Sequence, residues 1–323
     1  MIRTALCDLL GVDSPIVLAP FGPWDQVELA AAVSNAGALG SVGTAVRSAD
    51  ELKDQWNRLR VLTNRPFAIN HTGRPLNIDA FEATLEFEPK VISFHMGIPH
   101  ELIGRAKERG ILWMQTVGDT EAAAQALSAG VDVLVAQGTE AGGNAGWIAT
   151  LVLVPAVVDM AGDVPVVAAG GMADGRGIAA ALALGAQGVS LGTRFLATRE
   201  MTIDASWKQR IVQGGALDTV KVRHSERVMP PFNVPQVGVP FAPRCLRTPL
   251  TDQLERDPDA IDPAEMGPIL VEAIRSGGGH DLLPFTGQSA QLVHDILPAP
   301  ELVARLVAET EAAVANTAAS IVV

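Results

Sequence analysis

The sequence predicts an α/β protein of the (β/α)8 barrel class, with a smaller segment inserted after the eighth strand. Ala-rich helical runs alternate with short apolar segments as far as residue 196, and a glycine ends the clearest of these runs. The apolar segments lack polar alternation, which is typical of strands buried on both faces of a parallel sheet. Eight such segments can be counted, the number that this barrel requires. An open, doubly wound sheet is the structural alternative.

The predicted elements follow one another at short intervals along the chain. The repeat of helix, glycine and strand is clearest at 28–44, 102–118, 121–138 and 177–193. The glycines expected in left-handed C-caps there are Gly37, Gly110, Gly130 and Gly185. The eight predicted strands are 15–20, 41–44, 67–70, 91–97, 111–117, 131–138, 164–171 and 188–195.

The character of the sequence changes after the eighth predicted strand. Residues 197–290 contain a basic cluster at 221–227 and an apolar, Pro-rich run at 229–243. We expect an ordered, lid-like insertion packed over the mouth of the barrel, with a surface excursion away from any site as the alternative. Residues 291–323 are expected to supply a C-terminal helix, starting at 299, that closes on the barrel formed by residues 1–196.

Composition and charge exclude several classes of function. The formal charge is −12, from 24 Lys and Arg against 36 Asp and Glu, so a nucleic-acid partner is not expected. Cys7 and Cys245 cannot form a disulfide framework, which favours a cytoplasmic protein. The N-terminal residues do not resemble a signal peptide. The most apolar run, 151–161, is interrupted by Pro155 and Asp159 and is too short to span a membrane.

In a barrel of this class the active site lies at the carboxyl ends of the strands. The predicted ends are rich in glycine and neutral amides and lack a carboxylate cluster. This pattern argues against a two-metal hydrolase and a paired-carboxylate glycosidase, and no metal site is expected. Backbone N–H groups and amide side chains would instead suit a flat ring system that forms hydrogen bonds.

Two glycine-rich segments predict a phosphate site. AAGGMADGRG at 168–177 and SLGTRF at 190–195 end the seventh and eighth predicted strands, the usual place for phosphate in this barrel. We expect free N–H groups at a helix that begins near Gly175, and a hydroxyl donor from Thr193. The loop at 138–146 holds four glycines in nine residues, which suggests backbone wrapped around a ligand. A mobile loop is the alternative.

Several motifs together resemble the nitronate monooxygenase family, formerly called 2-nitropropane dioxygenases. They are AVSNAGALGSVG, SFHMGIP, VLVAQGTEAGGNAG, PVVAAGGMADGRGIAAALALGAQGVSLGTRF and FTGQSAQLVHDILP. The resemblance runs from about residue 14 to 195 and resumes near 286. Relatives of that family include flavin-dependent enoyl thioester reductases and NADH:quinone reductases. The resemblance implies a flavoprotein oxidoreductase, a monooxygenase, that binds FMN non-covalently in a (β/α)8 barrel.

The resemblance also implies which residues contact the cofactor. We expect Ala19, Pro20 and Phe21 under the flavin ring, and Asn70 and Gln137 at its polar edge. The residues expected around the ribityl phosphate are Gly143, Gly170, Gly171, Gly192 and Thr193, and Gln288 is expected to add a contact from the C-terminal segment.

Asn144 and His95 are the candidate catalytic residues. The family's loop after strand six usually reads EAGGH, and its His is regarded as the catalytic base, whereas this chain has Asn144. An amide forms hydrogen bonds but does not accept a proton near neutral pH. His95, in SFHMG, could orient an anionic substrate, act as a substitute acid or base, or only bind backbone beneath the flavin. His71 is expected to point away from the site, toward the surface.

The resemblance implies that alkyl nitronates are oxidised with O2 to a carbonyl compound and nitrite. An anionic nitronate needs no base, so Asn144 is compatible with this reaction. One alternative is reduction of an enoyl thioester or a quinone, with NAD(P)H as a further small-molecule partner. An alternative of another class is an FMN-binding protein whose catalysis is weak or lost. No membrane partner is expected.

Overall fold

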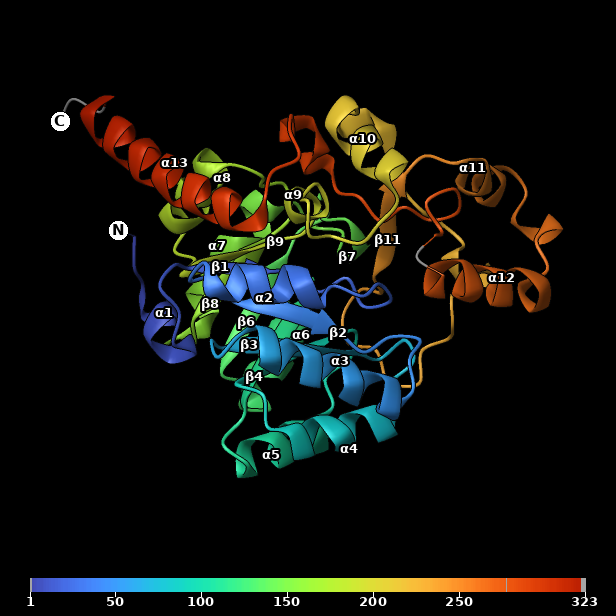
Figure 1. Cartoon of the computed structure of the whole chain (residues 1–323), viewed down its shortest axis with the longest axis horizontal. Coiled ribbons are helices and arrows are strands. Elements are labelled where there is room, and N and C mark those ends of the chain that lie inside the picture. The colour runs from blue at the N-terminus through green and yellow to red at the C-terminus, as the bar shows by residue number, and fades with distance from the viewer. Residues whose placement is uncertain (1, 277, 321–323) are drawn as a thin grey trace.

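Eight parallel strands form the centre of the computed structural model, which describes residues 2–276 and 278–320 (Figure 1). The strands are β1 (Ile16–Leu18), β2 (Gly40–Gly43), β3 (Phe67–Thr72), β4 (Val91–His95), β5 (Leu112–Val117), β6 (Val133–Gln137), β8 (Val166–Ala169) and β9 (Gly188–Leu191). Their order in the sheet is β1-β9-β8-β6-β5-β4-β3-β2. All eight coincide with predicted strands. The last is shorter than predicted because the chain enters a short helix, α9 (Thr193–Leu196), directly after it.

The sheet closes into a barrel between its first and last strands. Leu39, which immediately precedes β2, bridges to Val17 of β1 in parallel register. The Leu18 N–H donates to the Leu39 carbonyl at 2.9 Å, and the Leu39 N–H donates to the Ile16 carbonyl at 2.9 Å. These bonds confirm the barrel and exclude the open sheet.

Helices surround the barrel and close one end of it. The outer layer consists of α2 (Val27–Asn35), α3 (Ala49–Leu62), α4 (Ile78–Phe87), α5 (His100–Glu108), α6 (Thr120–Ser128), α7 (Thr150–Ala161), α8 (Gly175–Ala183) and α13 (Ala299–Ser320). At the amino end of the strands, α1 (Ala5–Leu10) buries Leu6 and Leu10 against inward-facing strand residues. This spacing of four residues places both side chains on one helix face. The last three residues of the predicted C-terminal helix, 321–323, lie outside the described residues.

The residues between α9 and α13 form a second body of structure at the other end of the barrel. They comprise α10 (Ala205–Gln213), η1 (Ala216–Asp218), β10 (Thr219–Lys221), η2 (Ser225–Arg227), β11 (Ala242–Leu246), α11 (Pro249–Arg256), η3 (Pro258–Ala260), α12 (Pro263–Arg275) and η4 (Gln288–Leu292). β10 and β11 form a three-stranded antiparallel sheet with β7 (Gly143–Ala145), which belongs to the loop after β6. The inserted segment therefore adds its strands to a loop of the barrel itself.

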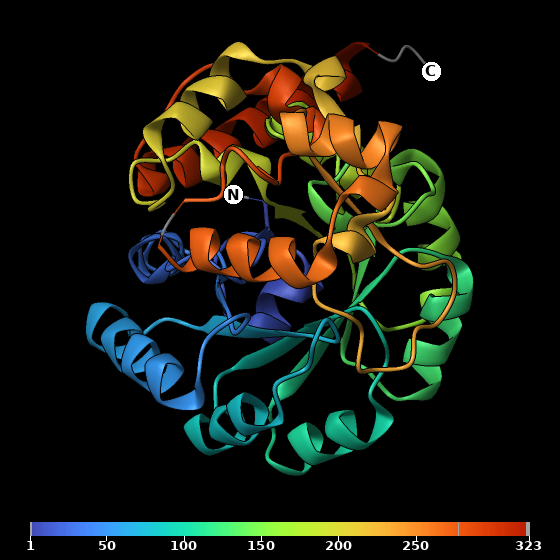
Figure 2. The same cartoon turned by 90° about the vertical axis from the view of Figure 1, so that its right-hand side faces the viewer.

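The Pro-rich segment 229–243, here called the strap, passes over the carboxyl ends of the barrel strands. Figure 2 views this end of the barrel, with α12 and the strap in front of the strands. Near its start, the Arg74 Nε donates to the Pro230 carbonyl at 2.8 Å. Asn233 and Leu76 exchange two hydrogen bonds, at 2.6 and 2.9 Å. The first part of the strap is thus fixed to the loop after β3.

The second half of the strap is fixed to the loops after β5 and β6. The Val239 N–H donates to the Asp119 carboxylate at 2.8 Å, and the Trp147 Nε1 donates to the Pro240 carbonyl at 2.9 Å. Proline has no backbone N–H, and two of these five tethers use the carbonyl of a strap proline as acceptor. The strap is held at several points across the mouth of the barrel.

Among the described residues, no helix has the length and apolar character that crossing a bilayer would require.

Asp119 has two roles, and we predict that its replacement separates them. One oxygen caps α6 by accepting from the Ala122 N–H at 2.8 Å, and the other holds Val239. We expect Asp119→Ala to reduce the free energy of unfolding by about 2 kcal/mol, for a lost cap and a lost hydrogen bond, and to speed amide exchange in 236–241. Asp174→Ala, which removes a comparable cap from α8, should leave exchange in the strap unchanged. Equal exchange in the two variants would refute a tethering role.

Candidate active site

Three buried polar atoms at the mouth of the barrel lack a hydrogen-bond partner among the described residues. They are the Nε2 of His95, at the end of β4, the Oε1 of Gln137, at the end of β6, and the Oδ1 of Asn144, in β7. Leaving a buried polar atom unpaired costs about 1–3 kcal/mol. Three such atoms at one end of the barrel fit a ligand that has polar groups of its own, as the edge of a flavin ring has.

The two candidate catalytic residues, His95 and Asn144, both lie beside residues 241–243 of the strap. The Phe241 ring packs edge-on against the His95 ring, with centroids 4.7 Å apart. Pro243 pairs with Asn144 across the antiparallel strands β11 and β7. Sequence reasoning did not single out Phe241, because nothing local in the strap indicates which barrel loop it covers.

His95 is neutral in this environment. Burial lowers the pKa of its imidazole to about 4. Its main chain is followed by Met96 and Gly97, both with positive φ, at 66° and 96°. A Cβ on Gly97 would lie 2.5 Å from the Val234 side chain, so glycine allows the strap to approach the end of β4. The imidazole can donate or accept one hydrogen bond at Nε2, but it is a weak base.

Asn70, predicted at the polar edge of the flavin, is buried at the end of β3. Its Nδ2 donates to the Ser93 hydroxyl at 3.0 Å on the neighbouring strand β4. The amide is therefore held in a fixed orientation by the barrel wall. Gln115, at the end of β5, is fully buried, and its amide bonds to three backbone carbonyls, so it is committed to structure.

Backbone loops converge where the phosphate is predicted. Gly143, Gly170 and Gly171 all have positive φ, of 68°, 104° and 77°, conformations that favour glycine. The Thr193 hydroxyl oxygen accepts the Gly287 N–H at 2.8 Å, which leaves the hydroxyl proton free to donate. The residue after Gly287 is also fixed, because the Gln288 N–H donates to the Glu140 carbonyl at 2.9 Å in the loop after β6.

Gly192 adds a separate indication of a ligand. Its φ is −105°, which other residues also adopt. A Cβ placed on it would make only ordinary contacts, 3.5 Å from the side chains of Ala19 and Phe21. Neither backbone conformation nor protein packing therefore requires glycine, whereas a ligand lying against the backbone would. The same contacts bring Ala19 and Phe21, with Pro20 between them, beside the predicted phosphate loops.

The comparisons with known proteins identify the family of this chain. The family model for nitronate monooxygenases matches residues 3–74 and 77–309. The chain belongs to the nitronate monooxygenase family. It is an enzyme, a flavin-dependent oxidoreductase of the monooxygenase class.

The curated relatives include both a nitronate monooxygenase and a dehydrogenase of a CoA thioester. The chain is 34% identical over 360 residues to a nitronate monooxygenase from Paraburkholderia phytofirmans, covering 94% of each chain. It is 37% identical over 260 residues to (3aS,4S,5R,7aS)-5-hydroxy-7a-methyl-1-oxo-octahydro-1H-indene-4-carboxyl-CoA dehydrogenase from Rhodococcus jostii, covering 79% of this chain and 68% of the relative.

Two solved structures are similar over almost the whole chain. FabK from Thermotoga maritima has a TM-score of 0.88 at 32% identity, covering 99% of this chain and 100% of that one. Nitroalkane oxidase from Streptomyces ansochromogenes has a TM-score of 0.81 at 29% identity, covering 98% and 100%.

The sequence predicted that the N-terminus of α8 is free to bind phosphate. In this member of the nitronate monooxygenase family, that prediction was wrong. Asp174 accepts from the Arg176 and Gly177 N–H groups at 2.9 and 3.2 Å, and the Gly175 N–H donates to Glu309 at 3.1 Å. A Cβ on Gly175 would clash with the Glu309 backbone, so α13 covers this helix end. The Gly175, Arg176 and Gly177 N–H groups are therefore not free to bind phosphate.

The expected surface position of His71 was also wrong. β3 continues past Asn70 to Thr72, so His71 points outward from the barrel into the layer beneath α4, where it is fully buried. Its two ring nitrogens lie 3.3 Å from the Thr44 hydroxyl and 2.9 Å from the Thr84 hydroxyl. Burial lowers its pKa to about 3, and the neutral ring is part of the packing.

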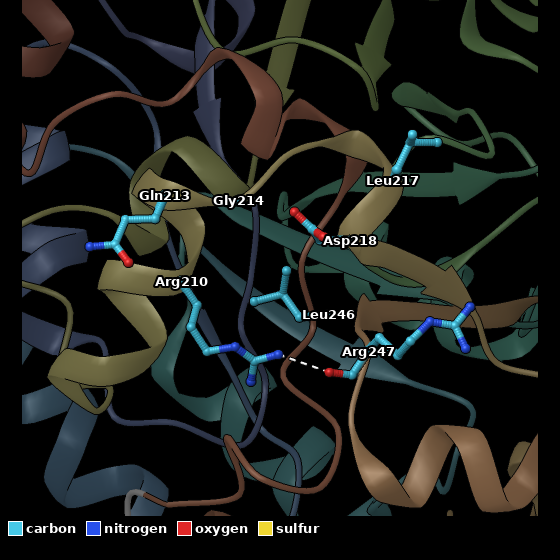
Figure 3. Close-up of a pocket in the computed structure, with 7 residues that line it drawn as sticks. All are labelled: Arg210, Gln213, Gly214, Leu217, Asp218, Leu246 and Arg247. Atoms are coloured by element: carbon cyan, nitrogen blue, oxygen red, sulfur yellow. Dashed lines mark hydrogen bonds between the residues drawn. The ribbon is translucent and has the colours of Figure 1, made fainter.

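Two cavities in the described part of the chain lie away from the predicted site residues. One, of about 300 Å³, lies between α10, η1 and β11 and is lined by residues that include Arg210, Asp218 and Arg247 (Figure 3). The other, of about 250 Å³, lies beside Trp24, where α12 meets the first barrel loops. No group of three or more His, Cys, Asp or Glu in the described residues could hold a metal ion.

Gly192 provides a direct test of the phosphate site. We expect Gly192→Ala to leave the free energy of unfolding of the flavin-free protein within about 0.5 kcal/mol, because the added methyl meets only ordinary contacts. Flavin affinity should fall at least tenfold, as measured by fluorescence titration with FMN. Gly110→Ala, at a helix end where nothing crowds the Cβ but φ is 70°, should do the reverse. Unchanged affinity in Gly192→Ala would place the cofactor elsewhere.

Proposed function

We propose that this protein binds FMN and oxidises alkyl nitronates with O2, giving a carbonyl compound and nitrite, without using a catalytic base. The observation that carries this proposal is the chemistry of the two groups beside residues 241–243. The Asn144 amide does not take up a proton near neutral pH, and burial lowers the pKa of His95 to about 4. Neither group can efficiently remove a proton from carbon at pH 7.

A nitronate avoids the step that this site cannot perform. It has already lost the proton that a neutral nitroalkane retains, so only binding, orientation and electron transfer remain. The neutral His95 can donate one hydrogen bond to a nitronate oxygen from Nε2, and the Asn144 amide can donate another. When bound, the flavin would accept the electrons that leave the substrate.

FMN is favoured over a larger flavin by the closure of its predicted phosphate end. A Cβ on Gly142 would lie 2.6 Å from the Gly287 nitrogen, so the loop after β6 and the C-terminal segment touch there. Gly143, Gly171 and Thr193 could hold a terminal phosphate beside this contact. The flavin released on denaturation can be identified by chromatography.

A reductase acting on a CoA or other thioester is the second candidate. It is favoured by the relative from Rhodococcus jostii, whose name specifies a CoA thioester, and by the apolar strap side chains of Val234 and Phe241 at the mouth of the barrel. Rapid anaerobic bleaching of the flavin by NADPH, with none by nitronate, would favour this candidate over the first.

We predict a strong preference for preformed nitronates over neutral nitroalkanes. A nitronate, assayed before it is reprotonated, should be oxidised with a kcat/KM at least 100-fold above that of its parent nitroalkane, because only the latter needs a base; base catalysis typically contributes 10²–10⁴-fold. Asn144→His should raise nitroalkane oxidation, and Asn144→Gln, an amide of greater length, should not. Comparable turnover of the two substrate forms by the unmodified protein would contradict the proposal.

The pKa of His95 predicts its contribution to the pH profile. An imidazole with a pKa of about 4 stays neutral as pH rises from 5.5 to 7.5, so kcat/KM for a nitronate should show no titration of His95 there. We expect His95→Gln to lower kcat/KM about tenfold, the loss of roughly one hydrogen bond, without changing the profile. A rate limb near pH 6.5 that disappears in this variant would show that His95 acts as a base.

A further inference from the structure

Lys221, at the end of β10, holds the loop that carries Asn144. Its Nζ donates to the carbonyls of Ala145, at 2.8 Å, and of Gly146. It also lies 3.3 Å from the Thr139 hydroxyl. These acceptors lie on both sides of Asn144 in the segment 138–147, here called the β6 loop. One ammonium group therefore ties together the start and the end of this loop.

Further contacts between the insertion and the β6 loop surround the ammonium group. The Lys221 Nζ lies 4.6 Å from the centroid of the Trp147 ring, in cation–π geometry. On the adjacent strand, the Arg244 Nε donates to the Thr139 carbonyl at 2.9 Å, and Arg244 pairs in register with Gly143. Two cations, one from β10 and one from β11, thus hold the β6 loop mainly through its backbone oxygens.

In the described part of the chain, the hydrogen bonds of Lys221 and Arg244 run to carbonyl and hydroxyl oxygens. The charged groups that face Lys221 are Arg244 and Glu140. The Glu140 carboxylate is used elsewhere, because it accepts from the Thr150 N–H and hydroxyl at 3.0 and 2.8 Å and caps α7. The contacts of Lys221 are therefore with the β6 loop rather than with a carboxylate.

The surroundings of Lys221 disfavour the charged form of its side chain. Burial, with Arg244 nearby and partly offset by Glu140, lowers the pKa of its ammonium group from 10.5 to about 8. The folded chain binds this proton less tightly than the unfolded chain does, so keeping the charge at neutral pH lowers stability.

We propose that Lys221 is a positioning residue that acts through Asn144, by fixing the β6 loop so that the Asn144 amide faces the substrate. The role of Asn144 in this inference rests on the proposed function. The fixing of the loop does not.

The first experiment measures the loop itself, without turnover. In Lys221→Met, amide exchange in 139–147, followed by mass spectrometry, should become at least tenfold faster, with exchange in the barrel strands and the thermal midpoint unchanged or the midpoint raised. Lys208→Met is the matched control, because Lys208 is also partly buried in the insertion and its Nζ donates to one carbonyl, that of Thr198, at 2.7 Å. It should leave 139–147 unchanged. Unaltered exchange in Lys221→Met would overturn the proposal.

The second experiment asks whether Lys221 acts through Asn144. With a preformed nitronate, Lys221→Met should lower kcat at least tenfold with a smaller change in KM. The double variant Lys221→Met/Asn144→Ala should be no slower than Asn144→Ala alone, because residues that act through one another are not additive. Multiplicative losses would overturn the coupling to Asn144.

The pH profile distinguishes the charge from the shape of the side chain. Activity of the unmodified protein should fall as pH rises through about 8, where Lys221 loses its proton. Lys221→Arg, which stays charged, should recover most of the activity and shift this fall to higher pH. If the unmodified protein oxidises no nitronate at all, the proposed function fails, and the exchange measurement alone decides whether Lys221 fixes the loop.

Discussion

The arrangement of the site depends on the antiparallel pairing of β11 with β7. This pairing joins residues about a hundred positions apart, and it places Pro243 opposite Asn144. The Pro243 carbonyl accepts the Val222 N–H at 2.7 Å, on the β10 side. Since the N–H and C=O of a residue in an antiparallel strand point to the same side, the N–H that proline lacks would also face β10. The proline therefore removes no hydrogen bond between β11 and the loop that carries Asn144.

The mouth of the barrel combines a rigid frame with unpaired polar atoms. Gln115, and His71 in the layer outside the barrel wall, have all or most of their polar groups bonded within the protein. At the mouth, His95, Gln137 and Asn144 each retain a buried unpaired atom. Residues of similar chemistry thus divide into those whose polar atoms are bonded within the protein and those that retain an unpaired one. Because the second group is neutral, the site is suited to hold and orient a substrate more than to transfer protons.

The sequence predicted the barrel well because its signals are local. Each strand buried on both faces and each glycine that ends a helix is recognised within a short stretch of sequence. The eight strands, including the last one, could therefore be located from the sequence. Predictions that depended on distant residues were less successful. The N-terminus of α8 looked open until Glu309 was seen to cover it, and His71 looked exposed because β3 runs two residues further than its apolar pattern. Lys221 was visible only as a member of a basic cluster, since its acceptors lie some 80 residues earlier.

The cover that Glu309 places on α8 also bears on how the chain becomes a folded barrel during synthesis. The contact that covers Gly175, at the start of α8, comes from Glu309 of α13, more than 130 residues later in the chain. The eight barrel strands have all been synthesised by residue 191. The helix that covers the end of α8, α13, is synthesised only after the whole insertion. A nascent chain of this length therefore carries all eight barrel strands while one end of α8 is still uncovered. Such long-range closure slows folding and leaves apolar surface exposed to other chains in the meantime.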